Sequence, residues 1–171
     1  MVKHFVANSQ EFLRESVDAI ISERALHEVY YVPFEACVRA GAASIMCSYN
    51  KVNGVHTCGN SRVLQQLKEN LRFTGWVMSD WWAVTDANAL PFVDQEMPGT
   101  GTYGRPAHYG DAALAAAARR TTTVVEHQNV SVLDDMASRI IGGMLRADAF
   151  REPVCSAGCN CAPSLYSPRR P

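Results

Sequence analysis

The sequence predicts an α/β protein in which parallel strands alternate with helices. Short apolar runs that suit buried strands occupy residues 1–6, 43–48 and 75–79, and stretches of helical character separate them. The second and third runs end abruptly in polar or aromatic residues, as a buried parallel strand does when its C-terminal end opens into a site. This order of strand, helix, strand and helix is typical of parallel βα units.

The first half of the chain fits this rhythm. Residues 11–40 have a mostly helical pattern, which Pro33 is expected to break or kink near its middle. Gly41 then ends the helix, and the second strand follows. Residues 50–59 are expected to form a loop, marked by the pair Asn53-Gly54.

The second half adds two helices, a short strand and a loop. A helix is expected over 61–72 with Ser61 as its N-cap, because leucines share one of its faces. Residues 90–94 are a shorter strand candidate, and 97–110 is rich enough in glycine and proline to be a loop. The alanine-rich stretch 111–120 has high helix propensity.

A last helix is predicted to begin at Ser131, with Asp134 three residues on as a capping-box-like partner. Asn129-Val130-Ser131 is also an N-glycosylation sequon, which has meaning only in the secretory pathway. The capping role of Ser131 is the competing interpretation.

Length and composition exclude several classes of protein. A chain of 171 residues, 47% of them hydrophobic, can bury a core and is expected to form one domain. The net charge of -1 argues against nucleic acid or an anionic membrane as a partner. No stretch approaches about 18 consecutive apolar residues, so no membrane-spanning helix is expected. No cofactor is predicted.

Two short cassettes carry the candidate chemistry, residues 44–50 and 75–81. In the second, Asp80 stands between a serine and Trp81. A carboxylate can attack a sugar as a nucleophile, and an indole offers a flat apolar face to a pyranose ring. Alternatively, Asp80 only caps a following helix.

This pair of cassettes, with a helix between them, resembles glycoside hydrolase family 3, the β-glucosidase-like enzymes. Further segments match the family in the same order, over about residues 1–149. They are Lys3-His4-Phe5, Ser22 to Tyr30 with Pro33-Phe34, Asn60-Ser61, Asp94 with Met97-Pro98-Gly99, and Leu133 to Ile140.

The resemblance implies a (β/α)8 barrel of the TIM type, which typically needs about 250 residues. We therefore expect residues 1–150 to form a partial barrel, roughly its last four βα units, without the first half or the family's following domain. The first residues lie within a strand motif, so no signal peptide is expected. Residues 151–171, which contain cysteine, proline and arginine, are expected to be a disordered tail.

The resemblance also implies roles for individual residues. Asp80 is the expected nucleophile, at the strand end where barrel enzymes place catalytic groups. The expected substrate-binding residues are Lys3, His4, Met46, Tyr49 and Trp81. For Lys3 and His4 the alternative is an exposed, flexible N-terminus.

Two features bear on the reaction and on the branch of the family. Glu96 is not assigned as the acid, because the family's acid/base usually comes from a later domain. The run from Lys3 to Ser9 lacks the Lys-His-Phe-Pro-Gly-His-Gly pattern of the N-acetylglucosaminidases, which favours the β-glucosidase branch. Trp82 departs from the family, in which a small residue commonly follows the stacking tryptophan.

Five of the six cysteines fall into two groups, and Cys37 is expected to be a small core residue on an apolar helix face. Cys47 and Cys58 flank a loop where secreted members of the family often carry a cysteine pair, so a disulfide is expected in an oxidising compartment; two unpaired thiols are the alternative. The spacing of Cys155, Cys159 and Cys161 does not fit the paired knuckles of structural zinc sites. No metal site is therefore predicted.

The predicted function is retaining hydrolysis of the O-glycosyl bonds of terminal β-glucosides. The expected partner is a β-glucoside or oligosaccharide substrate, together with a missing barrel half or second domain. Because the acid is absent, we expect a truncated fragment with little activity alone. The alternatives are a non-catalytic carbohydrate-binding remnant and an incomplete gene product.

Overall fold

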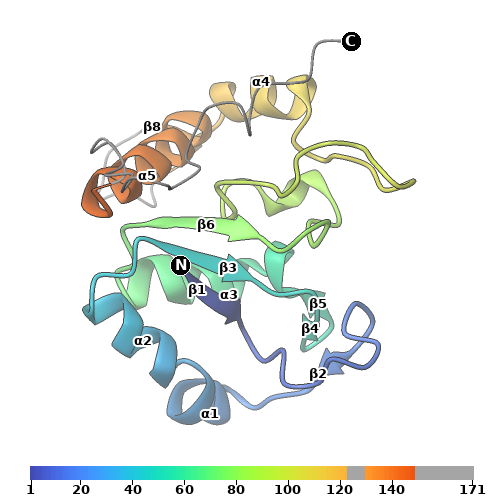
Figure 1. The fold of residues 1–171 in the computed structure, drawn as a ribbon, viewed down its shortest axis with the longest axis vertical. Helices are drawn as coiled ribbons and strands as arrows, with labels where there is room; N and C mark the ends of the chain where they lie inside the picture. Colours follow the sequence, from blue (N-terminus) through green and yellow to red (C-terminus); the bar gives the residue numbers. More distant parts are fainter. Residues whose placement is uncertain (123–129, 149–171) are drawn as a thin grey trace, which may run out of the picture.

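The computed structural model describes residues 1–122 and 130–148. At its centre is a three-stranded parallel sheet in the order β1-β3-β6 (Figure 1). Residue Ile45 pairs with Val77, and Cys47 pairs with Ser79. These strands confirm the three predicted apolar runs; their bounds are Val2–Phe5 for β1, Ser44–Cys47 for β3 and Trp76–Ser79 for β6.

Helices connect the strands of this sheet. The segment between β1 and β3 contains a nearly continuous helix, made of α1 (Glu23–Ala25), the π-helical turn η1 (Leu26–Tyr30) and α2 (Val32–Arg39). The segment between β3 and β6 contains α3 (Ser61–Gln65) and the π-helical turn η3 (Gln66–Asn70). The βα rhythm predicted from the sequence is therefore present.

The predicted helix over 11–40 is wrong in its first part. Residues 12–16 are turns, in which Leu13 has a φ of 54°, and the helix begins only after Ser22. The extended strand β2 (Asp18–Ala19) pairs in parallel with β4 (Lys51–Val52). Long-range pairing of these residues has overridden a local helical pattern.

The helical stretch is interrupted beside Pro33, as predicted: η1 ends at Tyr30, Tyr31 is a bend, and α2 begins at Val32. Pro33 lies in the first turn of α2, where its missing N–H costs no hydrogen bond. The cap of the next helix differs from the prediction, because Asn60 precedes Ser61 and its side-chain oxygen accepts from the Val63 N–H. Asn60 therefore replaces Ser61 as the N-cap.

The loop predicted over 50–59 contains a tight hairpin. Strand β4 pairs antiparallel with β5 (Val55–His56), and a single 3-10 turn, η2 (Thr57–Gly59), follows. Asn53 and Gly54 form the turn with φ values of 51° and 89°, as a two-residue hairpin with right-handed twist requires. The Asn53 side chain also bonds both backbone groups of Ile21.

The short strand predicted over 90–94 does not form. Turns follow η4 (Ala87–Ala89), and only Gln95 bridges in parallel to Met78 of β6. Asp94 and Gln95 both donate their N–H groups to the Val77 carbonyl. Asp94 and Gln95 therefore bond to the edge of the sheet at the C-terminal end of the predicted strand, and not along its length.

The last described part packs beyond β6 (Figure 1). Helix α4 (Asp111–Arg119) confirms the alanine-rich prediction, and α5 (Val132–Arg146) begins after Ser131, whose hydroxyl accepts from the Asp134 N–H as predicted. A two-stranded pair lies between them, β7 (Thr121–Thr122) with β8 (Val130–Ser131).

Helix α5 is anchored to the turn before β6. The Arg139 guanidinium bonds Asp135 and the Phe73 carbonyl, and Arg146 bonds the Thr74 carbonyl. Gly143 lies so close to Trp76 that a Cβ at this position would stand 2.4 Å from the indole carbon Cε3. A glycine is therefore needed for the helix to approach the strand.

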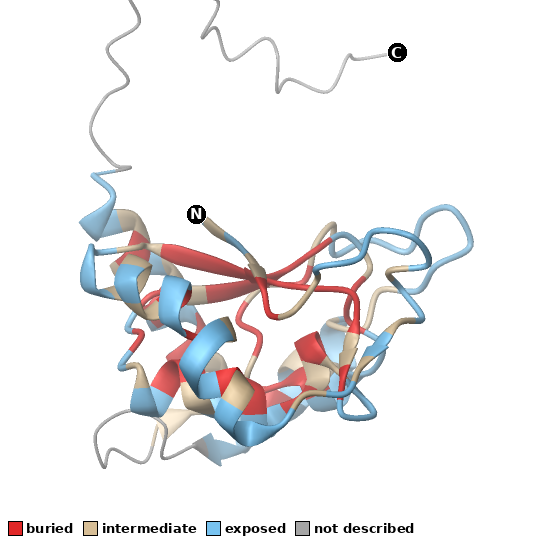
Figure 2. Ribbon diagram, turned by 90° about the horizontal axis from the view of Figure 1, so that it is seen from below, coloured by how far each residue is buried: buried red, intermediate tan, exposed pale blue. Residues whose placement is uncertain are grey.

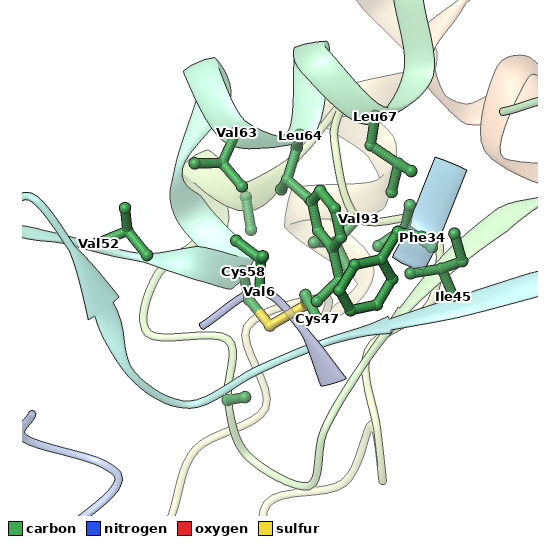
Figure 3. Close-up of a cluster of buried hydrophobic side chains, with 14 of the residues drawn as sticks. Val6, Phe34, Ile45, Cys47, Val52, Cys58, Val63, Leu64, Leu67 and Val93 are labelled. Atoms are coloured by element: carbon green, nitrogen blue, oxygen red, sulfur yellow. A yellow bond between two sulfur atoms is a disulfide. The ribbon is translucent and has the colours of Figure 1, made fainter. Parts of the chain in front are cut away.

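Buried residues concentrate in the sheet, in the helix faces against it and in the segments that follow β3 and β6, while residues 9–16 and 99–106 are largely exposed (Figure 2). Ile45 and Cys47 of β3 join the main cluster with helix residues such as Leu64 and Leu67 (Figure 3). Within the described residues, no helix has the length and apolar character that crossing a membrane requires. The predicted tail over 151–171, with Cys155, Cys159 and Cys161, and Asn129 of the sequon lie outside the described residues.

Candidate functional site

The candidate site is centred on Asp80, which directly follows β6 and is 8% exposed. Its N–H donates to the Cys47 carbonyl at the end of β3. Carboxylate oxygen Oδ1 accepts from the Tyr49 hydroxyl at 3.0 Å and from the Trp81 N–H at 2.8 Å. Oxygen Oδ2 lies 3.3 Å from His4 Nε2. A histidine within β1 and the residues that follow β3 and β6 therefore meet at one carboxylate.

Tyr49 is buried, and its environment favours the neutral phenol. Burial, followed by the hydrogen bond to Asp80 and the charge of that carboxylate, raises the pKa of Tyr49 to about 12. A phenol with this pKa stays protonated at neutral pH and continues to donate to the carboxylate. The pair is therefore a stable donor–acceptor contact and not a proton-transfer couple.

The N-terminal strand brings His4 to the site but leaves Lys3 outside the contact. His4 is partly exposed and faces Asp80, whereas the Lys3 side chain is exposed to solvent. The end of this strand is held beside β3, because the Ser48 N–H donates to the Phe5 carbonyl and the Asn50 amide donates to Val6. His4 thus belongs to an ordered strand.

Met46 and Trp81 differ in exposure. Met46 is 2% exposed and pairs with Met78 of β6, and neither belongs to the cluster that contains Ile45 and Val77. Since side chains alternate along a strand, the two methionines share the other face of the sheet. Trp81 is 40% exposed, so its ring is available to a ligand.

Sequence reasoning missed Arg14. Its guanidinium carbon lies 4.4 Å from the centroid of the Tyr49 ring, while one of its nitrogens is 2.8 Å from the Glu11 carboxylate. Arg14 belongs to the stretch that was predicted to be helical, and a helix would have hidden this contact. A turn that returns to the site leaves little local signal in a sequence.

The loop after β3 is fastened around Tyr49. A disulfide joins Cys47 and Cys58, with Cα atoms 5.3 Å apart, and it lies within the main buried cluster (Figure 3). The Thr57 hydroxyl bonds both Ser48 oxygens, and His56 Nδ1 lies 2.9 Å from the Tyr49 carbonyl. The disulfide and these hydrogen bonds therefore hold the backbone on both sides of Tyr49, the residue that contacts Asp80.

The neighbouring carboxylates have other partners. Asp94 accepts from Lys68 at 2.7 Å and from the Val77 N–H, with both side chains of this ion pair fully buried. Burial raises the pKa of Asp94 and lowers that of Lys68, and their mutual attraction opposes both changes. Glu96 accepts from the backbone N–H groups of His108 and Tyr109. Both carboxylates therefore hold loops in place.

Trp82 has an unusual setting beside the site. It adopts a φ of 58°, and its indole N–H is buried without a hydrogen-bond partner. Tyr103 makes an edge-on contact with its ring. A pocket of about 280 Å³ is lined by Trp82, Val84, Thr85, Arg105, Pro106 and His108. Within the described part of the chain, no cluster of three or more histidine, cysteine, aspartate or glutamate residues could hold a metal ion.

Comparison with known proteins assigns the family. The model of the glycosyl hydrolase family 3 N-terminal domain matches residues 1–96, and the chain belongs to this family. Beta-glucosidase 2 of Saccharomycopsis fibuligera is 36% identical over 170 residues, which cover 87% of this chain and 19% of that protein. A probable beta-glucosidase L of Aspergillus fumigatus is 40% identical over 163 residues, which cover 92% and 22%.

Solved structures agree with this assignment. Beta-D-glucoside glucohydrolase from Trichoderma reesei superposes with a TM-score of 0.73 at 37% identity, covering 86% of this chain and 20% of that one. DesR, a beta-glucosidase from Streptomyces venezuelae solved in complex with D-glucose, gives 0.68 at 36% identity, with 89% and 20% covered. The chain spans about a fifth of the length of these relatives.

Proposed function

We propose that Asp80 is the nucleophile of a retaining β-glucosidase reaction. The observation that carries this proposal is the convergence of Tyr49 and His4 on the two oxygens of one carboxylate at a strand end. A carboxylate held from both sides has a fixed orientation toward an incoming anomeric carbon, which lowers the entropic part of the barrier. The exposed ring of Trp81 stands next to it, where a sugar ring can stack.

The proposed reaction has two steps. In the first, an Asp80 oxygen forms a bond to the anomeric carbon while the bond to the leaving oxygen breaks, and a second carboxyl protonates that oxygen. In the second step, the second carboxyl, now a carboxylate, takes a proton from water, whose oxygen bonds to the anomeric carbon as the bond to Asp80 breaks, and the configuration is retained. His4 and Lys3 donate hydrogen bonds to sugar hydroxyls, Tyr49 holds the carboxylate, and Met46 forms part of the subsite wall.

The general acid is expected outside the described residues. Asp94 is bonded to Lys68, and Glu96 is bonded to two backbone N–H groups, so neither carboxyl is directed at a leaving group. General acid catalysis contributes about 10²–10⁴-fold in rate. The chain alone should therefore act on substrates with good leaving groups and show little turnover of an unactivated disaccharide.

The same proposal includes the architecture. We propose that residues 1–150 are about four βα units of a (β/α)8 barrel, with 151–171 as a separate tail. Three parallel strands in chain order, helices between them and a site at their C-terminal ends support this arrangement. The substrate class, a β-glucoside or a related oligosaccharide, rests on the names of the relatives and on the glucose complex of one of them.

The test is covalent labelling with a 2-fluoro glucoside that carries an activated leaving group. Such a leaving group departs with little acid assistance, so the reagent reports on the nucleophile alone. We expect the intact mass of the purified chain to rise by one fluorosugar, and peptide mapping to place the sugar on Asp80. The Asp80→Ala variant should remain unlabelled, while Asp86→Ala, which removes an exposed carboxylate nearby in sequence, should be labelled normally.

An unlabelled chain with a native-like circular dichroism spectrum would contradict the proposal. Saturable glucose binding by such a chain would favour the carbohydrate-binding alternative, for which the exposed Trp81 ring is the supporting observation.

A further inference from the structure

Two loops from distant parts of the sequence meet beside the candidate site. The first is residues 11–16, which we name the N-terminal turn, and the second is residues 97–110, which we name the glycine-rich loop. A Glu15 carboxylate oxygen lies 2.9 Å from Arg105 Nη2, and the other lies at 3.2 Å. This ion pair joins residues 90 positions apart and links the two loops directly.

Each loop also covers an aromatic residue that adjoins Asp80. The residue before Glu15 is Arg14, whose guanidinium lies over the Tyr49 ring at 4.4 Å. In the glycine-rich loop, the Arg105 guanidinium carbon is 5.7 Å from the centroid of the Trp82 ring. Two residues of chain span at most about 7 Å, so Trp82 is close to Asp80 by covalent connection alone.

The ion pair therefore bridges the two sides of the nucleophile. Tyr49 contacts Asp80 and lies beneath the N-terminal turn, and Trp82 follows Asp80 and lies beneath the glycine-rich loop. We propose that Glu15 and Arg105 are positioning residues that clasp these loops together and so set the placement of Tyr49 and Trp82 around Asp80.

The exposure of the pair suits a clasp that opens. The side chains of Glu15 and Arg105 are 52% and 43% exposed. Exposed ion pairs contribute little to stability and are screened by salt. The clasp can thus release to admit a glucoside and close again at small cost. The N-terminal turn makes short-range backbone bonds, from Arg14 to Glu11 and from Ser16 to Leu13, and the Glu15–Arg105 pair ties it to the glycine-rich loop.

Charge reversal and charge exchange test the clasp. We expect Glu15→Arg and Arg105→Glu each to slow labelling of Asp80 by the 2-fluoro glucoside about two- to fivefold. The double variant carries the exchanged pair and should return to within about twofold of the parent rate. A merely local structural role for either side chain would not give this rescue. The matched control is exchange of Glu35 and Arg39, an exposed pair on α2, which should leave the labelling rate unchanged.

A second readout does not depend on catalysis. The labelling assay rests on the proposed function, whereas amide hydrogen exchange reports the loops directly. Each single reversal should speed exchange in both the N-terminal turn and the glycine-rich loop, and the double variant should restore protection. Faster exchange in only one loop, or no rescue in the double variant, would overturn the clasp even if Asp80 is labelled. Restored protection in a chain that is never labelled would support the clasp and count against the nucleophile.

Discussion

The hydroxyl of Tyr49 donates to Asp80 Oδ1 over 3.0 Å and joins the ends of two adjacent strands, β3 and β6. Both residues are nearly buried, at 7% and 8% exposed. Because the raised pKa keeps the phenol neutral, Tyr49 continues to donate its hydrogen bond to Asp80. This contact gives Asp80 a defined orientation in the structure before any sugar is bound.

Removal of this hydroxyl should slow the first chemical step. We expect Tyr49→Phe to lower the labelling rate by about 10- to 100-fold, because Asp80 loses the donor that fixes the orientation of its carboxylate toward the anomeric carbon. The rate of mass increase with the 2-fluoro glucoside is the measurement. Tyr30→Phe on η1 is the matched control and should label at the parent rate. Equal rates for all three chains would show that the hydroxyl has no role in the reaction.

The same contact should make stability depend on alkaline pH. The pKa of Tyr49 is raised from 10.0 to about 12 in the folded chain, so the neutral phenol is favoured by folding. Its stabilising contribution is complete below about pH 10 and is lost as the pH rises towards 12. Urea unfolding at pH 9, 10 and 11 should show a smaller decline for Tyr49→Phe than for the parent.

Tyr31 and Tyr109 are the reason for making that comparison with a variant. Burial raises the pKa of Tyr31 to about 12 and that of Tyr109 well above its ordinary value, so the parent chain loses stability with rising pH from three tyrosines. If the free energy of unfolding declined equally in Tyr49→Phe and in the parent, the whole pH dependence would come from other groups.

The disulfide should contribute measurably to stability. Closing a loop of about 12 residues is worth roughly 3 kcal/mol in the chain-entropy account. We expect reductant to lower the free energy of unfolding of the parent by about this amount. The double variant Cys47→Ala, Cys58→Ala should have a lower free energy of unfolding than the parent, and reductant should not change that value. Cys37→Ser removes a thiol that is free in the structure, so reductant should lower its free energy of unfolding by as much as that of the parent. If reductant had no effect on Cys37→Ser, the result would point to another cross-link.

The close packing of α5 against β6 should tolerate a substitution at Gly142 but not at Gly143. At Gly143 an added Cβ would lie 2.4 Å from Trp76 Cε3, whereas at Gly142 the nearest atom is 3.5 Å away in the flexible Arg146 side chain. We expect Gly143→Ala to destabilise by about 1–3 kcal/mol through overpacking. Gly142→Ala should be neutral or stabilise by up to about 1 kcal/mol. Thermal unfolding of both variants checks the contrast.

The sequence predicted the parts of the fold that depend on local patterns. The three strands of the central sheet and α4 follow from apolar runs and helix propensity, and the cap at Ser131 follows from its spacing to Asp134. The stretch 11–22 could not be predicted in this way. Its shape depends on pairing with β4 and on the Asn53 side chain, and such partners are distant in sequence.

The site was predictable to a similar extent. Asp80 and Tyr49 stand at strand ends, where a pattern of apolar runs can locate them. Arg14 and Glu15 stand in a turn and Arg105 in a loop, where no periodicity marks a residue as close to the site. Their contacts with Tyr49 and with Trp82 depend on how two loops fold back. Only the three-dimensional structure brings them together.

The way Asp94 and Gln95 cover β6 has a consequence for self-association. The Val77 N–H is taken by the Asp94 carboxylate, the Val77 carbonyl accepts from the backbone of both residues, and the Ser79 N–H donates to Gln95. An uncovered strand edge is a template for a strand of another molecule and thus a route to aggregates. Here Asp94 and Gln95 occupy these groups, so β6 cannot recruit a neighbouring chain without first displacing them, and the buried Lys68–Asp94 pair holds Asp94 in place.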